Sequence, residues 1–325
     1  ALVTSLGAAG ARADTIVVAN ENGQSLSIID SQTSKTTTAA IPISPHNVDV
    51  TADGRLILAT GMPAAQSGSH AAHGSAGGQL ILMDVAGDAP GAPQVVTVGG
   101  HPAHVVPDAQ GHFAYLTDAE ANSVVVVDIP GRRVTGRIPV QNYPHGLRLS
   151  PDGNLLAVAN MKSDTVSLVD TRNPEKAMHI PVGKRPVQVA FDRSGRILVV
   201  SLNGEDKVAI VDVDTRKVLR KASVGNGPVQ VYVTPDGKAA LVANQGSRVP
   251  SPASTHSNQL STGQIARCGQ IARKNGPWAT FSTRALIGAA RSLAQWGRQP
   301  QRCESACRPS SSRCSRASCV VGAAL

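Results

Sequence analysis

The sequence predicts an all-β fold, a β-propeller of four-stranded blades. Three landmarks repeat every 42 residues: a proline that starts each unit, a glycine in its first turn and an aspartate that ends its third strand. They lie at Pro102, Pro144, Pro186 and Pro228, at Gly111, Gly153, Gly195 and Gly237, and at Asp128, Asp170 and Asp212. A strand-only repeat of roughly 40–45 residues is typical of propeller blades, which stack around an axis because one blade cannot bury both faces of its sheet.

The unit that begins at Tyr143 illustrates the expected blade. Its first strand alternates in polarity and leads into Ser150-Pro-Asp-Gly153, where proline presets a turn φ and Gly153 adopts the left-handed conformation. Three further hydrophobic runs follow, each bounded by turn-forming residues. The four strands are expected at residues 147–149, 155–159, 165–169 and 177–182.

The first repeat is incomplete, and the second carries an insertion. In the first, residues 15–20, 25–30 and 36–43 match the second, third and fourth strands of a blade. We expect its innermost strand to come from the C-terminus and close the ring. The second repeat starts at Pro45 and contains a Gly/Ala/Ser-rich insertion at residues 61–78, which explains its greater length.

The repeats stop within the sixth unit, after Gly246. We therefore expect a propeller body over residues 14–246, nominally seven-bladed with five to six recognisable blades, and a basic tail of low order over residues 247–325. Two interpretations of the tail stay open, a native extension and translation out of frame. A shift of one nucleotide from Arg273 permits Lys-Thr-Gly-x-Gly-Pro-His, which resembles a repeat junction, although only the glycine at Trp278 is forced.

The excess positive charge and all the cysteines lie in the tail. It holds ten Arg and one Lys against one Glu, so it carries +10, and the remainder carries −1 of the total of +9. A nearly neutral body argues against a nucleic-acid partner. All five cysteines also lie in the tail, so cysteine usage in the body does not report a redox compartment.

Residues 1–13 form a short apolar run that ends in Ala11-Arg12-Ala13, the small-residue pattern of a signal-peptide cleavage site. We interpret the run as a signal-peptide remnant, with an Ala-rich leader as the alternative. The run is too short to span a membrane. The expected protein is periplasmic or secreted, has no membrane span and is monomeric.

The repeat resembles the YVTN-type, or YncE-like, β-propeller family, a WD40-like group, over five units within residues 15–245. The resemblance rests on Ser150-Pro-Asp-Gly153, Leu156-Ala-Val-Ala-Asn160, Asp164-Thr-Val-Ser-Leu-Val-Asp170 and Ile180-Pro-Val-Gly183. Where the family commonly has Tyr-Val-Thr-Asn, Tyr-Leu-Thr-Asp at residues 115–118 comes closest. The resemblance implies an exported, seven-bladed propeller. It implies no single activity, because relatives include binding proteins, lactonase-like enzymes and haem- or quinone-associated dehydrogenase subunits.

Histidines gather where the innermost strands begin. His46, His104 and His145 follow repeat-start prolines, so we expect them to ring the mouth of the central channel. His70 and His73 lie in the insertion, which should overhang that mouth. Imidazole binds copper, zinc, nickel and haem iron, so a transition metal or haem is the cofactor that this pattern favours. The alternative is a set of solvated loop histidines.

Other polar residues suggest a ligand face. His101, Lys184, Arg185 and Arg148 lie at or near the same mouth and offer an anion site, with a solvated surface as the alternative. The aspartates that end the third strands, which include Asp84, are expected to cap turns. No residue is assigned a catalytic role.

Three functions follow from these features. The favoured one is an exported, non-enzymatic propeller that binds a small molecule or a protein on its channel face. The first alternative is a redox protein, like haem d1 nitrite reductase or a dehydrogenase subunit, that holds a metal or haem with the channel-mouth histidines. The second alternative is a lactonase-like hydrolase, although no acid–base constellation stands out.

Overall fold

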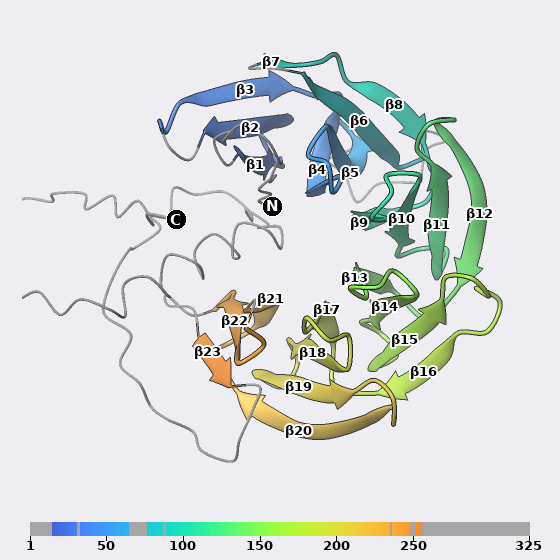
Figure 1. Cartoon of the computed structure of the whole chain (residues 1–325), viewed down its shortest axis with the longest axis vertical. Helices are drawn as coiled ribbons and strands as arrows, with labels where there is room; N and C mark the ends of the chain where they lie inside the picture. The colour runs from blue at the N-terminus through green and yellow to red at the C-terminus, as the bar shows by residue number, and fades with distance from the viewer. Residues whose placement is uncertain are drawn as a thin grey trace, which may run out of the picture.

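The computed structural model describes residues 15–30, 33–64, 77–86, 89–234, 236–246 and 251–254. These residues form six antiparallel sheets that follow one another in chain order around a central axis (Figure 1). The fold is a β-propeller, as predicted. None of the described residues form a helix with the length and hydropathy of a membrane span.

The strands are numbered along the chain, and each blade begins with its innermost described strand. Blade 1 contains β1 (Thr15–Asn20), β2 (Ser25–Asp30) and β3 (Thr36–Ala40). Blade 2 contains β4 (Ile43–Val50), β5 (Leu56–Pro63), β6 (Gln79–Ala86) and β8 (Gln94–Thr97), with the short β7 (Ala89–Pro90) beside β6. Blade 3 contains β9 (Pro102–Pro107), β10 (Phe113–Asp118), β11 (Ser123–Asp128) and β12 (Arg133–Pro139).

The remaining three blades repeat the same order. Blade 4 contains β13 (Pro144–Leu149), β14 (Leu155–Asn160), β15 (Thr165–Asp170) and β16 (Met178–Pro181). Blade 5 contains β17 (Pro186–Phe191), β18 (Ile197–Leu202), β19 (Lys207–Asp212) and β20 (Lys217–Ser223). Blade 6 contains β21 (Pro228–Val233), β22 (Ala239–Asn244) and β23 (Ser251–Ser254).

Some boundaries differ from the prediction. Ile43 begins β4 of blade 2 instead of ending blade 1, and β5 continues to Pro63, into the expected insertion. The strand β23 lies inside the expected tail, where it pairs with β22. The signal-peptide remnant, the strand expected to close blade 1 and the out-of-frame segment lie outside the described residues.

Burial follows the radius of the propeller. The inner strand β17 is buried along almost its whole length, whereas the outer strand β20 alternates between exposed and half-buried residues. Inner strands are covered on both faces by neighbouring blades, so even polar residues on them are buried, as Gln188 of β17 is. Leu58 and Leu80 of blade 2 pack with Leu116 of blade 3 in one such layer. Each buried leucine contributes about 1.5–3 kcal/mol to folding.

Asp128, Asp170 and Asp212 have the predicted capping role. The Asp128 carboxylate accepts the Gly131 N–H at 3.1 Å, and the Asp170 carboxylate accepts the Arg172 N–H at 2.9 Å. The Asp212 carboxylate likewise accepts a backbone N–H at 2.7 Å. These carboxylates stabilise turns and lie far out on their blades, away from the axis.

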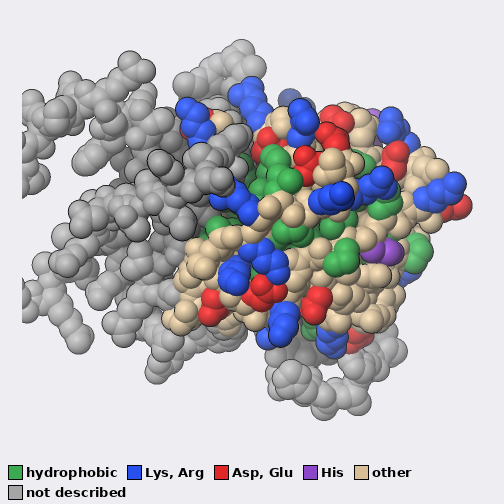
Figure 2. Space-filling model, turned by 90° about the horizontal axis from the view of Figure 1, so that it is seen from below, with side chains coloured by type: hydrophobic (Ala, Val, Ile, Leu, Met, Phe, Trp, Pro, Cys, Tyr) green, Lys and Arg blue, Asp and Glu red, His purple; other side chains and the backbone are tan. Residues whose placement is uncertain are grey.

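The outer surface carries mixed charge. Figure 2, a view from the side, shows acidic and basic side chains interspersed over the surface that it presents. This agrees with the nearly neutral net charge of the body.

A β-bulge marks the start of the inner strand in each of blades 2 to 6. The pairing shifts register between Pro45 and Asn47, between Pro144 and Leu147, and at the matching points of β9, β17 and β21. A bulge bends its strand and re-aims the neighbouring side chains. These bulges lie at the residues that follow each repeat-start proline, and they place those side chains at the axis.

Candidate metal centre

Three histidines meet at the propeller axis and form a cluster that we call the histidine triad. His46 comes from β4, His104 from β9 and His145 from β13. The ring centroids of His104 and His145 are 4.7 Å apart, and His46 lies 5.7 Å and 5.4 Å from them. Each ring offers one nitrogen within 4.8 Å of the other two. The structure therefore brings together the three histidines that follow the repeat-start prolines of blades 2, 3 and 4.

The spacing of the triad suits a transition metal after a small adjustment. Zinc binds imidazole nitrogen at about 2.0–2.1 Å, so two ligands of one tetrahedral ion lie about 3.3 Å apart. Nitrogens within 4.8 Å of one another need to approach by at most about 1.5 Å. Three imidazoles from three separate blades leave further coordination positions open, and imidazole suits zinc, copper and nickel.

One member of the triad already has the tautomer that a metal requires. The Nδ1 of His145 lies 3.2 Å from the carbonyl oxygen of Val187. A carbonyl can only accept, so Nδ1 carries the proton and Nε2 keeps its lone pair. A ligating histidine typically donates its other ring N–H to such a partner, which fixes the orientation of the ring.

His104 is held by an amide chain from blades 5 and 6. The Nε2 of Gln188 lies 3.3 Å from Nδ1 of His104 and donates to Oε1 of Gln230 at 3.2 Å. The Oε1 of Gln188 accepts the Val189 N–H at 2.9 Å, which orients the amide. The proton of neutral His104 therefore lies on Nε2. Coordination of a metal by that nitrogen requires the proton to move to Nδ1 and the Gln188 amide to turn over.

Burial keeps the triad uncharged. Desolvation lowers the pKa of His46 to about 3 and the pKa of His145 to about 4, with repulsion from neighbouring cations as a smaller cause. The pKa of His104 is also lowered, mainly by burial. All three rings are neutral at pH 7, and neutral imidazole is the form that binds metals.

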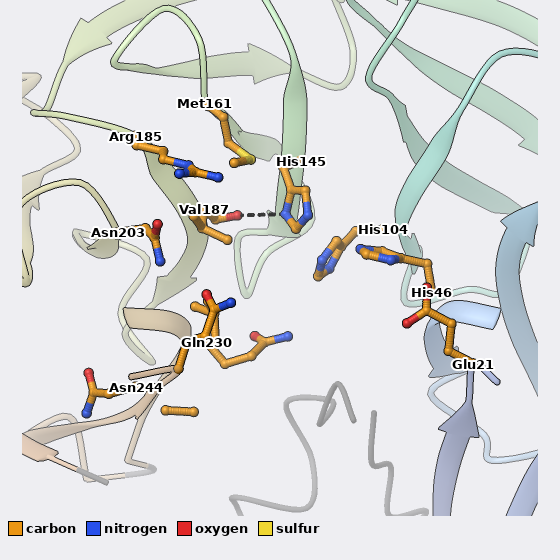
Figure 3. A pocket seen from close by; sticks show the side chains of 13 residues that line it. Glu21, His46, His104, His145, Met161, Arg185, Val187, Asn203, Gln230 and Asn244 are labelled. Atoms are coloured by element: carbon orange, nitrogen blue, oxygen red, sulfur yellow. Dashed lines mark hydrogen bonds between the residues drawn. The ribbon is translucent and has the colours of Figure 1, made fainter. Parts of the chain in front are cut away.

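A cavity of about 420 Å³ opens beside the triad (Figure 3). The three histidines form part of its wall. Its other polar lining residues are Glu21, Arg185, Asn203, Gln230, Asn244 and Gln245. Its apolar lining residues are Met161, Val187, Val229 and Ala243.

The two charged residues of the cavity lie far apart. In Figure 3 Arg185 is near Met161 on one side, Glu21 is near His46 on the other, and the triad lies between them. Burial raises the pKa of the Glu21 carboxyl, and the nearby His101 opposes this shift.

Arg185 is fixed by a hydrogen bond between loops that recurs from blade to blade. It precedes Pro186, adopts a φ of 53° and donates its backbone N–H to the Asp164 carboxylate at 2.8 Å. The Oδ1 of Asn122 accepts a hydrogen bond from the backbone N–H of Tyr143 at 2.9 Å. The Oδ1 of Asp206 likewise accepts the backbone N–H of Gly227 at 2.7 Å. Residues 122, 164 and 206 are 42 apart, so the repeat itself carries a signal for this contact that was not predicted.

The other residues of the expected ligand face do not line the cavity, although His101 lies close enough to act electrostatically on Glu21 and His46. Lys184 is exposed and donates its backbone N–H to Glu205, and His101 donates its own to Asp118 at 3.1 Å. Arg148 is only 8% exposed and donates to the carbonyl of Leu147. It lies farther along β13 than His145, and Asp49 acts on it electrostatically. Of this group, only Arg185 lines the cavity.

Two predicted site residues lie outside the described residues, and three residues of the site were not predicted from the sequence. His70 and His73 fall outside the described residues. Gln188 and Gln230 were not predicted, although they follow repeat-start prolines by two residues, as His104 does. Glu21 was also missed because it occupies a turn between β1 and β2 with no distinctive motif.

Comparisons with known proteins agree with the fold. Residues 75–179, about a third of the chain, match the family model described as "Lactonase, 7-bladed beta-propeller". This segment includes His104 and His145, and the YVTN-type resemblance falls in the same broad group of propellers. No curated protein matches the sequence.

A solved structure of Kuenenia stuttgartiensis hydrazine synthase is similar to this chain, with a TM-score of 0.51 and 25% sequence identity. The match covers 61% of this chain and 55% of the solved chain, so this chain spans about half of that protein's length. The chain is a β-propeller with partial similarity to the seven-bladed lactonase group.

Proposed function

We propose that this protein binds a divalent transition metal, such as zinc, copper or nickel, through the histidine triad at the propeller axis. The observation that carries the proposal is the convergence of three neutral imidazoles from three blades, with nitrogens within 4.8 Å of one another. The carbonyl bound to Nδ1 of His145 supports it, because that contact leaves Nε2 ready for a metal. The adjoining cavity gives a bound metal access to a further ligand. The signal-like N-terminus supports an exported location for this binding protein.

Metal titration of the full chain tests the proposal. After removal of metal with a chelator, zinc, copper and nickel are each titrated calorimetrically at pH 7.5. We expect one ion per chain with a dissociation constant below about 1 µM. His46→Asn and His145→Asn should each weaken binding at least about 100-fold, more than the loss of an outer-shell partner would.

The matched control is His112→Asn, which removes an exposed histidine on blade 3. This variant should bind the metal as the unchanged protein does. Absence of binding tighter than millimolar, or equal losses in all three variants, would contradict the triad as the metal site.

A second candidate function is hydrolysis of a lactone or ester. The observation that favours it is Glu21, a carboxyl with a raised pKa in the same cavity as the triad. A bound divalent metal would supply Lewis acidity and a water of lowered pKa. Glu21 could accept a proton there, and the partial match to the lactonase model gives the substrate class.

The hydrolase is tested by following acid release from simple lactones with the zinc-loaded protein. We expect Glu21→Gln to abolish turnover and to leave zinc affinity unchanged. Lack of turnover with every lactone would rule out this activity while leaving the metal site intact.

A further inference from the structure

We infer that the cavity beside the histidine triad, in its metal-free state, binds a small organic carboxylate through Arg185 and Gln230. This goes beyond the metal site and does not depend on it. The structure assigns the carboxylate to the side of the cavity where hydrogen-bond donors lack acceptors.

Gln230 supplies the first donor. The residue is only 5% exposed and lines the cavity. Its Oε1 is occupied by Gln188, whereas its Nε2 has no hydrogen-bond partner among the described residues. A buried donor without an acceptor is costly, so such groups commonly mark the place of a ligand or water. An acceptor oxygen in the cavity would satisfy it.

Arg185 supplies the charge. Its side chain lines the cavity, and within the described ranges no carboxylate forms an ion pair with it. A guanidinium presents two parallel N–H groups that match the two oxygens of a carboxylate. The contact between its backbone N–H and Asp164 fixes the position of its loop.

His104 adds a third donor group to the lining of the cavity. Because the Gln188 amide donates to its Nδ1, the proton of the neutral ring is on Nε2. The metal-free cavity therefore combines a guanidinium, an amide N–H and an imidazole N–H. This set recognises acceptor oxygens and negative charge.

The other lining residues indicate the size and polarity of the group that carries the carboxylate. Met161, Val187, Val229 and Ala243 give the cavity an apolar wall, and its volume of about 420 Å³ is near the lower end for small-molecule sites. An inorganic anion would leave this wall uncovered. A carboxylate with a short aliphatic or aromatic body fills both the polar and the apolar parts. Glu21 would repel the anion, but it lies on the opposite side of the cavity (Figure 3).

The test uses benzoate and its neutral counterpart benzamide, titrated into the full chain in the presence of a chelator. We expect measurable binding of benzoate and at least tenfold weaker binding of benzamide. Arg185→Gln should weaken benzoate binding at least tenfold, because a charge-assisted contact is lost. Lys184→Gln is the matched control, since it removes the same charge from the adjacent residue outside the cavity.

Gln230 is tested by two variants that separate packing from chemistry. Gln230→Leu removes the donor, and Gln230→Glu keeps the shape but replaces the donor with an acceptor. Both should weaken benzoate binding at least tenfold, with thermal melting used to confirm folding. Equal affinity for benzoate and benzamide, or equal effects of Arg185→Gln and Lys184→Gln, would overturn the inference. Because chelator is present throughout, this result is independent of the outcome of the metal titration.

Discussion

Replacement of Gln188 by glutamate should strengthen metal binding. In the metal-free protein the Gln188 amide donates toward Nδ1 of His104 and so holds the proton on Nε2. A metal bound through Nε2 needs the opposite tautomer and an acceptor at Nδ1. Gln188 is fully buried, so no solvent can supply that acceptor. The native amide thus opposes metal binding until it turns over.

The magnitude follows from the contacts around this side chain. Turning the amide over leaves the buried Val189 N–H without the acceptor that it has at 2.9 Å, a cost of about 1–3 kcal/mol. A glutamate carboxylate can keep that bond, accept from Nδ1 of His104 and accept from the Gln230 amide after it rotates. An outer-shell partner of a ligating histidine contributes about 10–100-fold to metal affinity, so Gln188→Glu should improve zinc affinity by about that factor.

A competition titration against a chromophoric zinc chelator at pH 7.5 measures the change. Gln188→Leu is the companion variant, because it removes donor and acceptor together and should lie well below Gln188→Glu in affinity. Thermal melting of the metal-free variants verifies that each is folded. If a folded Gln188→Glu protein binds zinc no more tightly than the native chain, the tautomer argument is refuted.

Three further predictions concern the scaffold of the site. Asp164→Ala should lower the free energy of unfolding by about 1 kcal/mol in urea titrations and loosen the Arg185 loop, because a backbone N–H loses its acceptor. Gly146→Ala should cost about 1–3 kcal/mol, because the added methyl group would overlap the backbone of blade 5, whereas Gly136→Ala, which meets open space, should be tolerated. In the metal-free protein the free energy of unfolding should fall as the pH decreases below about 6.5. Burial lowers the pKa values of the triad, that of His145 to about 4, so the unfolded chain binds protons over this range and the folded chain does not. Replacement of all three histidines by asparagine should remove that part of the pH dependence.

The fold could be predicted because the same turn and capping residues recur in successive blades. The turn that contains Gly153 and the capping Asp170 recur at a fixed period, so the strands assigned in one repeat support those assigned in the next. The ends of strands were predicted less accurately where the 42-residue repeat was interrupted. Pro63 continues a strand into sequence that has the composition of a loop, and β23 pairs within a segment that has no alternating pattern.

The site was predicted only in part. His46 and His145 stand directly after prolines, which placed them at the channel mouth. Their convergence with His104 depends on bulges and on the radius of the ring, which are properties of packed blades. Gln188 and Gln230 went unnoticed because glutamine is not a usual metal ligand, although both follow repeat-start prolines by two residues, as His104 does.

Two arginines were expected on the ligand face, and only one of them lines the cavity. Both Arg148 and Arg185 were expected on the ligand face, and a linear sequence does not reveal depth along the channel. Arg148 lies deeper on its strand and is buried there, whereas Arg185 precedes a strand and reaches the cavity.

X-ray absorption spectroscopy of the zinc-loaded full chain tests the central claim most directly. We expect three histidine nitrogens at about 2.0–2.1 Å, with their characteristic multiple-scattering signal lost in a variant that lacks the triad. Sulfur ligands at about 2.3 Å, which the cysteines of the tail could supply, or a shell of oxygens alone would contradict it.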